Sequence, residues 1–328
     1  MRIKVTPCWV SKKLGEAMKI LVLGAGAVGL YFGGVLALKG HTVQFGARSV
    51  SAVAINANGI RLDGPRGRFD IAHVTATATP EEASGADIVL LCVKRYDLLT
   101  AAAQWRVALA SAGAVICLQN GVDSQALLRQ AVPEAAGYGG LAFVAGRLES
   151  PGVMQYLSNM SSITFGGAGA TANKLLQTFA GALNAAALPV PASATLVDDI
   201  AMAQWEKFIA LATNAALTCI TRSPAGVVYH DADLLALARE SIAEILAVGR
   251  AEGLALHDSQ GAAALEMLKG LPAGMVASMH HDLVAGKALE IDGLSGHVCV
   301  LGARHGVPTP FHRFVYTCLK PHMHGATR

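Results

Sequence analysis

A glycine-rich segment near the N-terminus constrains the fold of this chain most. Residues 18–48 read MKILVLGAGAVGLYFGGVLALKGHTVQFGAR, and Gly24, Gly26 and Gly29 within them follow the spacing G-x-G-x-x-G. A short apolar run, suited to a buried parallel strand, precedes the first glycine. An apolar helix is predicted over 27–38, and a Lys-Gly pair typical of a helix C-terminus follows it. The segment therefore predicts a strand, a tight turn, a helix and a second strand.

Each glycine of this turn has its own steric role. Gly24 makes the tight turn, Gly26 lets backbone N–H groups approach a pyrophosphate, and Gly29 lets the helix pack closely on the strand. The helix N-terminus then faces the anion. A plain strand, turn and helix without a ligand is the alternative, and the flanking elements favour the dinucleotide site. The predicted cofactor-binding turn consists of Gly24, Ala25, Gly26, Ala27, Val28 and Gly29.

The end of the second strand indicates which dinucleotide is bound. NAD-binding folds usually place an acidic residue there to accept hydrogen bonds from the ribose hydroxyl groups. This chain has Gly46-Ala47-Arg48-Ser49 instead. A guanidinium group and a hydroxyl group suit a 2′-phosphate, so Arg48 favours NADP over NAD. The alternative reading of Arg48 is a solvated surface side chain.

Composition and length restrict the class of protein. The chain has 328 residues, of which 53% are hydrophobic and 15% are charged, so it is long enough for two domains and is not largely disordered. Its net charge of +3 is scattered, and aromatic residues make up only 5%, so nucleic acid is not an expected partner. No apolar run is long enough to cross a membrane. The six cysteines show neither C-x-x-C pairs nor zinc spacing, which favours reduced thiols, a cytoplasmic location and no metal site.

The chain separates into an α/β part and a helical part. Residues 87–93 and 114–118 are continuous apolar runs typical of buried parallel strands, so an α/β Rossmann-type domain with a doubly wound, mainly parallel sheet is predicted. Short strands at 154–157 and 162–165 are expected to extend this sheet in an antiparallel manner. The predicted division is an N-terminal extension at 1–17, which is either an arm or a mis-assigned start, an NADP-binding domain at 18–195 and an all-helical domain at 196–328. Helices are expected at 198–220, 232–252, 259–268, 273–285 and 290–305.

The helical part carries a polar stripe on an apolar helix. Lys207 lies near the start of the run FIALATNAALTCI, and Asn214 is about 20° away from it around a helix, with Leu211 between them and Thr218 beyond. A lysine in such a place is often snorkelled to solvent. Glu290 is expected to begin a helix, where an acidic residue is favoured by the helix dipole.

Together these motifs resemble the ketopantoate reductase (2-dehydropantoate 2-reductase) family, within the group similar to 6-phosphogluconate dehydrogenase. The landmarks occur in family order: GAGAVG at 24–29, CVK at 92–94, QNG at 119–121, WEK at 205–207, SM…D at 278–282 and EID at 290–292. The resemblance implies that NADPH reduces a 2-oxo acid, by default 2-dehydropantoate, to a 2-hydroxy acid in pantothenate and coenzyme A biosynthesis.

The resemblance also implies roles for single residues. Lys207 would be the general acid and Glu290 would hold the substrate or the nascent hydroxyl group. Asn120 and Ser278 would orient the substrate, with Asn214 as a further donor for its carboxylate. Arg48 and Lys94 would contact the phosphate region of NADP, and Asn120 would also border the cofactor. Such residue types suit the reaction, because a cation that donates a proton stabilises the charge that develops on a ketone oxygen.

Three positions depart from the family pattern and leave the substrate open. Leu211, Ala215 and Met275 stand where the family usually has asparagine. A related reductase of another branched or bulky ketone is therefore an alternative, and a non-catalytic NADP-binding sensor is an alternative of another class. Retention of both Lys207 and Glu290 argues against the sensor. The apolar helices permit a homodimer without requiring one.

Overall fold

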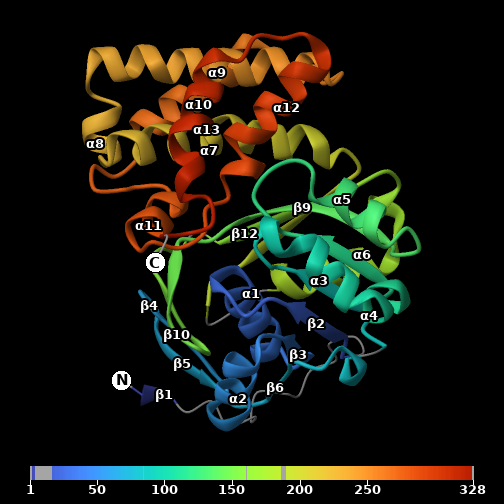
Figure 1. Cartoon of the computed structure of the whole chain (residues 1–328). Helices are drawn as coiled ribbons and strands as arrows, with labels where there is room; N and C mark the ends of the chain where they lie inside the picture. Colours follow the sequence, from blue (N-terminus) through green and yellow to red (C-terminus); the bar gives the residue numbers. More distant parts are fainter. Residues whose placement is uncertain (1, 4–16, 84, 160, 186–189, 327–328) are drawn as a thin grey trace. The chain divides into compact units, whose positions relative to one another are not determined.

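The computed structural model describes residues 2–3, 17–83, 85–159, 161–185 and 190–326. It divides into two units, one made of Met1–Gln119 with Asp123–Ile200 and the other of Asn120–Val122 with Ala201–Arg328 (Figure 1). The predicted boundary at 195/196 falls a few residues before this division. Most of the predicted extension at 1–17 lies outside the described residues.

The first unit is built on a mainly parallel sheet, which confirms the predicted fold class. Only the β9–β12 pair is antiparallel among the pairings of the described strands in this sheet, so β12 and β13 run opposite to the rest. The antiparallel addition predicted for 162–165 is therefore confirmed. The strand order is β13 (Ser193–Val197), β12 (Ser162–Gly166), β9 (Gly137–Phe143), β8 (Ala114–Cys117), β7 (Ile88–Leu91), β2 (Lys19–Leu23), β3 (Thr42–Gly46) and β6 (Val74–Thr77).

Both faces of this sheet are buried, as continuous apolar strands require. Successive side chains of a strand point to opposite faces, so Ile20 and Val22 enter one core, and Leu21 and Leu23 enter the other. The first core includes α1 (Ala27–Leu38), α2 (Ser49–Asn58) and α6 (Lys174–Asn184). The second core includes α3 (Leu98–Gln104), α4 (Arg106–Ser111) and α5 (Ser124–Ala131). Short 3₁₀ turns occur at η1 (Pro80–Glu82), η2 (Arg95–Asp97) and η3 (Ala170–Ala172).

A second, smaller sheet covers the other side of α1. Its order is β1 (Arg2–Ile3), β5 (Gly67–Ile71), β4 (Ile60–Gly64), β11 (Val153–Tyr156) and β10 (Gly146–Ser150). The expectation that 154–157 extends the main sheet is therefore wrong, because β11 pairs with β4 and β10. The physical reason lies in α1, which is apolar all round and is buried on both sides. A Cβ on Gly33 would lie 2.7 Å from Phe45 of the main sheet, and one on Gly34 would lie 2.9 Å from Leu62 of the small sheet.

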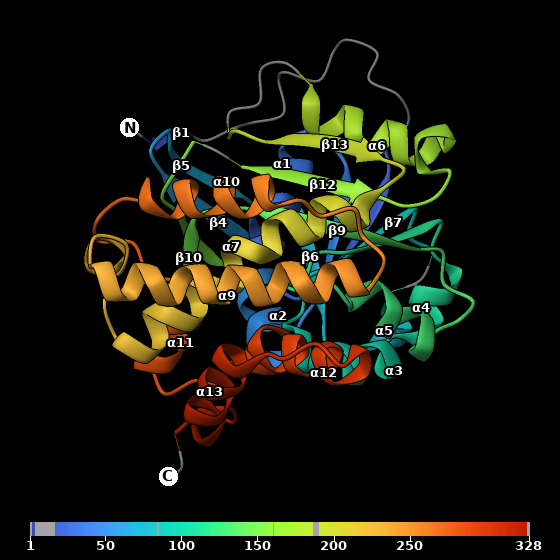
Figure 2. The same cartoon turned by 90° about the horizontal axis from the view of Figure 1, so that it is seen from above.

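The second unit is helical throughout its described residues apart from turns, as predicted. Its elements are α7 (Ile200–Thr221), α8 (Ala225–Val228), α9 (Ala232–Ala251), α10 (Asp258–Lys269), α11 (Ser278–Val284), η4 (Ile291–Gly293), α12 (Ser295–His305), α13 (Pro310–Leu319) and η5 (Lys320–His322). Figure 2 shows α9 alongside α10. Two helix boundaries were predicted wrongly. The helix expected at 273–285 begins only at Ser278, because Met275 turns back on Pro272 and its carbonyl accepts the Ala225 N–H.

The helix expected at 290–305 is interrupted. Glu290 precedes the 3₁₀ turn η4, and Leu294, with φ −111° and ψ −105°, separates that turn from α12. Glu290 is therefore not the first-turn acid of an α-helix. The dipole of an α-helix does not account for an acidic residue at this position.

A buried polar chain crosses the core of the second unit. His312, which is fully buried, lies 3.1 Å by its Nδ1 from Ser295 Oγ and 3.2 Å by its Nε2 from Ser241 Oγ. Ser241 Oγ in turn lies 2.8 Å from Thr213 Oγ1 on α7. The same Nε2 lies 3.3 Å from the Ser241 carbonyl oxygen, which only accepts, so Nε2 carries the proton of the neutral ring. Burial lowers the pKa of His312 to about 4.

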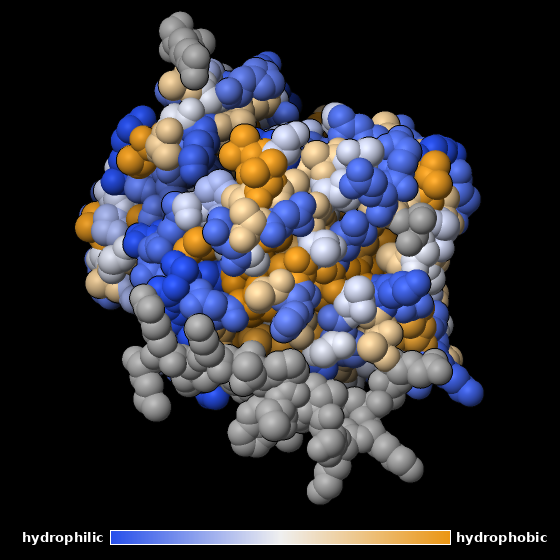
Figure 3. All heavy atoms as spheres, turned by 90° about the horizontal axis from the view of Figure 1, so that it is seen from below, coloured by the Kyte–Doolittle hydropathy of each residue, from blue (hydrophilic) through white to orange (hydrophobic). Residues whose placement is uncertain are grey.

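Among the described helices, none combines the length and the apolar character needed to cross a bilayer. The surface nevertheless carries some exposed apolar side chains. Val50 and Val53 of α2 are exposed. Figure 3 shows a face on which hydrophobic residues gather between hydrophilic ones. The five described cysteines are free thiols, and Cys8 lies outside the described residues.

Candidate active site

The turn between β2 and α1 has the geometry of an anion-binding loop. Gly24 has φ +109°, and a Cβ there would lie 2.8 Å from the backbone of Cys92 and Val93. A Cβ on Gly29 would lie 2.0 Å from the Gly24 carbonyl oxygen. A Cβ on Gly26, by contrast, would have no atom of the described residues within 4 Å. Two of the glycines are therefore required by packing, whereas Gly26 keeps open space in front of the helix.

The start of α1 offers backbone donors to this space. The first hydrogen bond across the helix start runs from the Leu30 N–H to the Gly26 carbonyl oxygen. The preceding N–H groups are those that a helix start leaves for an anion, and the first turn contains no acidic residue. Ala25, Ala27 and Val28 supply the remaining backbone of the loop. The residues present fit the pyrophosphate of a dinucleotide.

Arg48 and Lys94 follow the two strands that flank β2. Arg48 is the exposed N-cap residue of α2, two residues after β3, and Ser49 is the first residue of that helix. Arg48 thus stands at a helix N-terminus, where a phosphate is also favoured. Lys94 is the N-cap of η2 and is partly buried. It stands one residue after Val93, whose backbone lies against Gly24.

The loop that carries Asn120 is held on both sides. Gln119, which is buried, donates from Nε2 to the carbonyl oxygens of Leu91 at 2.8 Å and Val93 at 3.2 Å. After the loop, Asp123 forms a two-pronged ion pair with Arg95, in which Nε lies 2.9 Å from Oδ1. Both side chains of this pair are mostly buried. These contacts fix where the Asn120 backbone leaves β8. Gln119 is the first residue of the motif QNG and Arg95 directly follows the motif CVK, but neither was assigned a role from the sequence.

Lys207 meets Asn120 in the second unit. The Lys207 ammonium Nζ donates to Asn120 Oδ1 at 3.3 Å, although the two residues are 87 positions apart in the sequence. Lys207 is partly buried, and the largely apolar stretch of α7 begins directly after it. Burial lowers its pKa to about 8, and the negative charge of Glu290 acts in the opposite direction. Glu290 itself is only 7% exposed. Three of the predicted site residues, Lys207, Asn120 and Glu290, are therefore brought together.

The other predicted polar residues have different environments. Asn214 accepts a 3.0 Å hydrogen bond at Oδ1 from the hydroxyl group of Tyr229, which sequence reasoning missed. Thr218, expected on the same stripe, donates to the Asn214 carbonyl oxygen, so its hydroxyl group serves the helix backbone. Ser278 is exposed at the first position of α11, and its neighbour Ala277 contacts Thr218 through a 3.5 Å hydrogen bond.

The three departures from the family pattern also differ in exposure. Leu211 is partly exposed, Met275 is exposed, and Ala215 is fully buried. Of the three, only Leu211 lies on the same helix stripe as Lys207 and Asn214.

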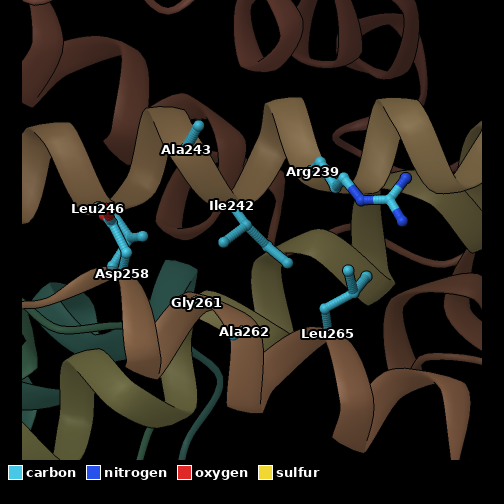
Figure 4. A pocket seen from close by; sticks show the side chains of 8 residues that line it. All are labelled: Arg239, Ile242, Ala243, Leu246, Asp258, Gly261, Ala262 and Leu265. Carbon is cyan, nitrogen blue, oxygen red and sulfur yellow. The ribbon is translucent and has the colours of Figure 1, made fainter.

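The second unit also has a groove that is not part of this cluster. The groove, of about 290 Å³, runs between α9 and α10, with Ile242, Leu246 and Leu265 along it (Figure 4). It follows from close helix packing at Gly261, where a Cβ would lie 2.7 Å from Leu246. Within the part of the chain that the structure describes, no group of three or more His, Cys, Asp or Glu residues is arranged to hold a metal ion.

Comparisons with known proteins agree with this geometry. The sequence profile described as "Ketopantoate reductase PanE/ApbA" matches residues 20–169, and "Ketopantoate reductase PanE/ApbA C terminal" matches residues 199–323. A 2-dehydropantoate 2-reductase of Caulobacter vibrioides is 29% identical over 304 residues, covering 92% of this chain and 97% of that protein.

Solved structures show the same relationship. A PanE/ApbA family ketopantoate reductase from Ralstonia eutropha JMP134 has a TM-score of 0.82 and 32% identity, covering 93% of this chain and 98% of the other. A D-mandelate dehydrogenase solved with NADH and anilino(oxo)acetate has a TM-score of 0.83 at 22% identity and 93% and 98% coverage, a likeness of fold. The chain belongs to the ketopantoate reductase family, a family of nicotinamide-dependent oxidoreductases that act on CH–OH groups.

Proposed function

We propose that this protein uses NADPH to reduce a 2-oxo acid to a 2-hydroxy acid, with 2-dehydropantoate to pantoate as the first candidate reaction. The observation that carries the proposal is the cluster of the partly buried Lys207 and Asn120 with the buried Glu290, in which the lysine pKa lies at about 8. The cofactor, when bound, supplies a hydride to the carbonyl carbon. The protein must then hold the substrate and deliver a proton to the carbonyl oxygen.

Lys207 is suited to deliver that proton. A general acid works best when its pKa is near the working pH, and an ordinary lysine with a pKa of 10.5 is a poor donor there. With a pKa of about 8, Lys207 is mostly protonated at pH 7 yet releases its proton readily. As the C–O π electron pair moves onto oxygen, the ammonium group first stabilises the negative charge and then transfers the proton from Nζ. The neutral amine regains a proton from solvent.

Asn120 and Glu290 hold this lysine in its charged form and direct it. The amide oxygen of Asn120 accepts one Nζ hydrogen, which orients the ammonium group that is proposed to face the substrate oxygen. The Glu290 carboxylate opposes the effect of burial on the lysine pKa and is suited to accept a hydrogen bond from the new hydroxyl group. Asn214 and Ser278 are proposed to contribute polar contacts to the substrate.

The first unit is proposed to hold NADPH. The open space at Gly26 and the N-terminus of α1 suit the pyrophosphate, with Ala25, Ala27 and Val28 in the same loop. Arg48 at the N-cap of α2 suits the 2′-phosphate, and Lys94 contributes positive charge beside the glycine turn.

A second substrate is favoured by one observation. Leu211 presents a partly exposed apolar side chain between Lys207 and Asn214 on α7, where a more polar residue is usual in the family. A reductase of another branched or bulky 2-oxo acid therefore remains the alternative. A non-catalytic NADP sensor is disfavoured, because a buried lysine with a lowered pKa beside a carboxylate has no evident use in a protein that only binds the nucleotide.

The experiment is a panel of 2-oxo acids assayed for oxidation of NADPH, with NADH in parallel. The panel contains 2-dehydropantoate, branched aliphatic acids and an aromatic acid. Highest kcat/KM with 2-dehydropantoate supports the first candidate, and a higher value with another branched or bulky acid supports the alternative. Absence of turnover on all members, despite tight NADPH binding in a titration, would contradict the reductase and support the sensor.

A further inference from the structure

The accessible face of α7 is narrow. From Phe208 to Cys219 every residue of this helix is buried except Leu211 and Asn214, and one turn earlier Lys207 is also partly accessible. Residues at these spacings share one helix face. Lys207, Leu211 and Asn214 therefore form the accessible stripe of this part of α7: an ammonium group, an apolar side chain and an amide.

Tyr229 fixes the amide of Asn214. The tyrosine side chain is 1% exposed, and its hydroxyl group lies 3.0 Å from Asn214 Oδ1. Among the residues that the structure describes, Asn214 Oδ1 is the acceptor for this hydroxyl hydrogen. If the amide were turned over, the buried O–H would lose its acceptor, which is unfavourable for a buried donor. The contact therefore keeps Oδ1 toward the tyrosine and leaves the Nδ2 hydrogens for the accessible face.

The position of Tyr229 is itself well determined. The residue is the C-cap of α8, and its N–H donates to the Ala225 carbonyl oxygen at 2.9 Å. Ala225 is in turn bound through its own N–H to the Met275 carbonyl oxygen at 2.8 Å. The hydroxyl group is thus presented to Asn214 from a segment with its own backbone contacts.

The spacing along α7 indicates which substrate oxygen Asn214 contacts. Asn214 lies seven positions after Lys207, which is about 10 Å along a helix axis, and the lysine side chain leans further away, toward the helix N-terminus. Two hydrogen bonds of about 2.9 Å span about 6 Å of that distance. The two substrate oxygens must then be roughly 4 Å or more apart. Neighbouring oxygens of a 2-oxo carboxylate, joined through bonds of about 1.2 and 1.5 Å, are closer than this.

We propose that Tyr229 is a positioning residue that keeps Asn214 a hydrogen-bond donor, and that this pair selects 2-oxo acids with a second oxygen beyond an apolar side-chain segment. Leu211 contacts that apolar segment, and Asn214 donates to the distal oxygen of a hydroxyl or ether group. The inference rests on the proposed 2-oxo acid reduction and narrows its substrate class.

The test compares two acids of one carbon skeleton, 4-hydroxy-3,3-dimethyl-2-oxobutanoate, which is 2-dehydropantoate, and 3,3-dimethyl-2-oxobutanoate, which lacks the hydroxyl group. Tyr229→Phe removes only the buried hydroxyl group, and Asn214→Ala removes the donor. Each variant is expected to lower kcat/KM for the hydroxylated acid about 5- to 10-fold, the scale of one neutral hydrogen bond, with less than 2-fold change for the other acid. In the Asn214→Ala background, Tyr229→Phe is expected to add nothing.

Tyr156→Phe is the matched control, because Tyr156 is equally buried and its hydroxyl group accepts a backbone hydrogen bond in the first unit. Equal losses on both acids in Tyr229→Phe would show a merely structural tyrosine and overturn the inference. Unchanged selectivity in Asn214→Ala would overturn it too, and that variant decides the matter if Tyr229→Phe does not fold. If the wild-type protein reduces 3,3-dimethyl-2-oxobutanoate and shows no preference for the hydroxylated acid, this inference alone is refuted. Wild-type protein that reduces neither acid refutes the proposed function for this class, and the inference with it.

Discussion

Gly26 and Gly29 lie three residues apart in one turn, yet the same substitution is expected to affect them in opposite ways. In Gly29→Ala the added Cβ would lie 2.0 Å from the Gly24 carbonyl oxygen and 3.0 Å from Val22 Cγ1. Backbone cannot move aside as a flexible side chain does, so the helix must shift from the strand. Overpacking of this kind costs about 1–3 kcal/mol, and a backbone clash this close belongs at the upper end.

In Gly26→Ala the added Cβ meets no described atom within 4 Å, and the residue has φ −86° and ψ −172°, which any L-residue adopts. Less freedom in the unfolded chain stabilises by about 0.4–1 kcal/mol, and a poorer N-cap residue offsets this by a few tenths. The free energy of unfolding is therefore expected to change by less than about 1 kcal/mol. The new methyl group nevertheless occupies the approach of the pyrophosphate, so NADPH affinity is expected to fall at least 10-fold, and Gly26→Val is expected to abolish binding.

Urea unfolding and fluorescence titration with NADPH, carried out on both alanine variants, separate the two effects. The expected pattern is a lowered stability in Gly29→Ala and a lowered affinity at normal stability in Gly26→Ala. Unchanged NADPH affinity in Gly26→Val would refute the assignment of this turn to the pyrophosphate. A strongly destabilised Gly26→Ala would refute the packing analysis.

Three further outcomes follow from the charges and burial of single residues. Arg48→Ala should weaken NADPH binding roughly 10- to 100-fold and leave NADH unchanged, because one charge-assisted phosphate contact is worth about 1.5–3 kcal/mol; equal affinities of the wild type for both nucleotides would argue against NADP. Glu290→Gln removes the charge that raises the Lys207 pKa, so the alkaline fall in kcat/KM should move to lower pH. An alkaline fall at the same pH as in the wild type would show that Glu290 does not act on the Lys207 pKa. His312 is neutral when folded but titrates at about 6.5 when unfolded, so its contribution is present above pH 6.5 and is lost as the pH falls toward 4. Between pH 7.5 and 5 the wild type should lose about 2 kcal/mol more unfolding free energy than His312→Gln, measured by urea titration of each, and parallel pH curves would contradict the lowered pKa.

Local sequence patterns predicted the helices and strands of the α/β part correctly where one pattern was strong. The helix predicted at 27–38 has those bounds in the structure, because the glycine turn and the Lys39-Gly40 ending leave no other register. The small sheet was missed, although DGPRG at 63–67 is a glycine-containing turn between two alternating runs and signals a hairpin. The unbroken apolar surface of α1, in which Gly33 packs against the main sheet and Gly34 against the small sheet, was a second signal that another layer covers it.

The candidate site depended on information that local patterns do not contain. Asn120 and Lys207 are far apart in the sequence, and only the order of the family motifs brought them into one hypothesis. Tyr229 carries no motif, and its contact with Asn214 arises from how α8 packs against α7. The lowered pKa of Lys207 likewise results from burial by residues spread along the chain, which no spacing rule predicts.

The central claim is that Lys207 donates the proton to the reduced carbonyl group. The most direct measurement is the pH profile of kcat/KM on the best 2-oxo acid, for the wild type, for Lys207→Ala and for the exposed control Lys269→Ala. A general acid must be protonated, so wild-type kcat/KM is expected to be level below pH 8 and to fall above it. Lys207→Ala should be at least about 100-fold slower, without that limb and with unchanged NADPH affinity. Near-normal turnover in Lys207→Ala, or an alkaline limb that survives the substitution, would contradict the account.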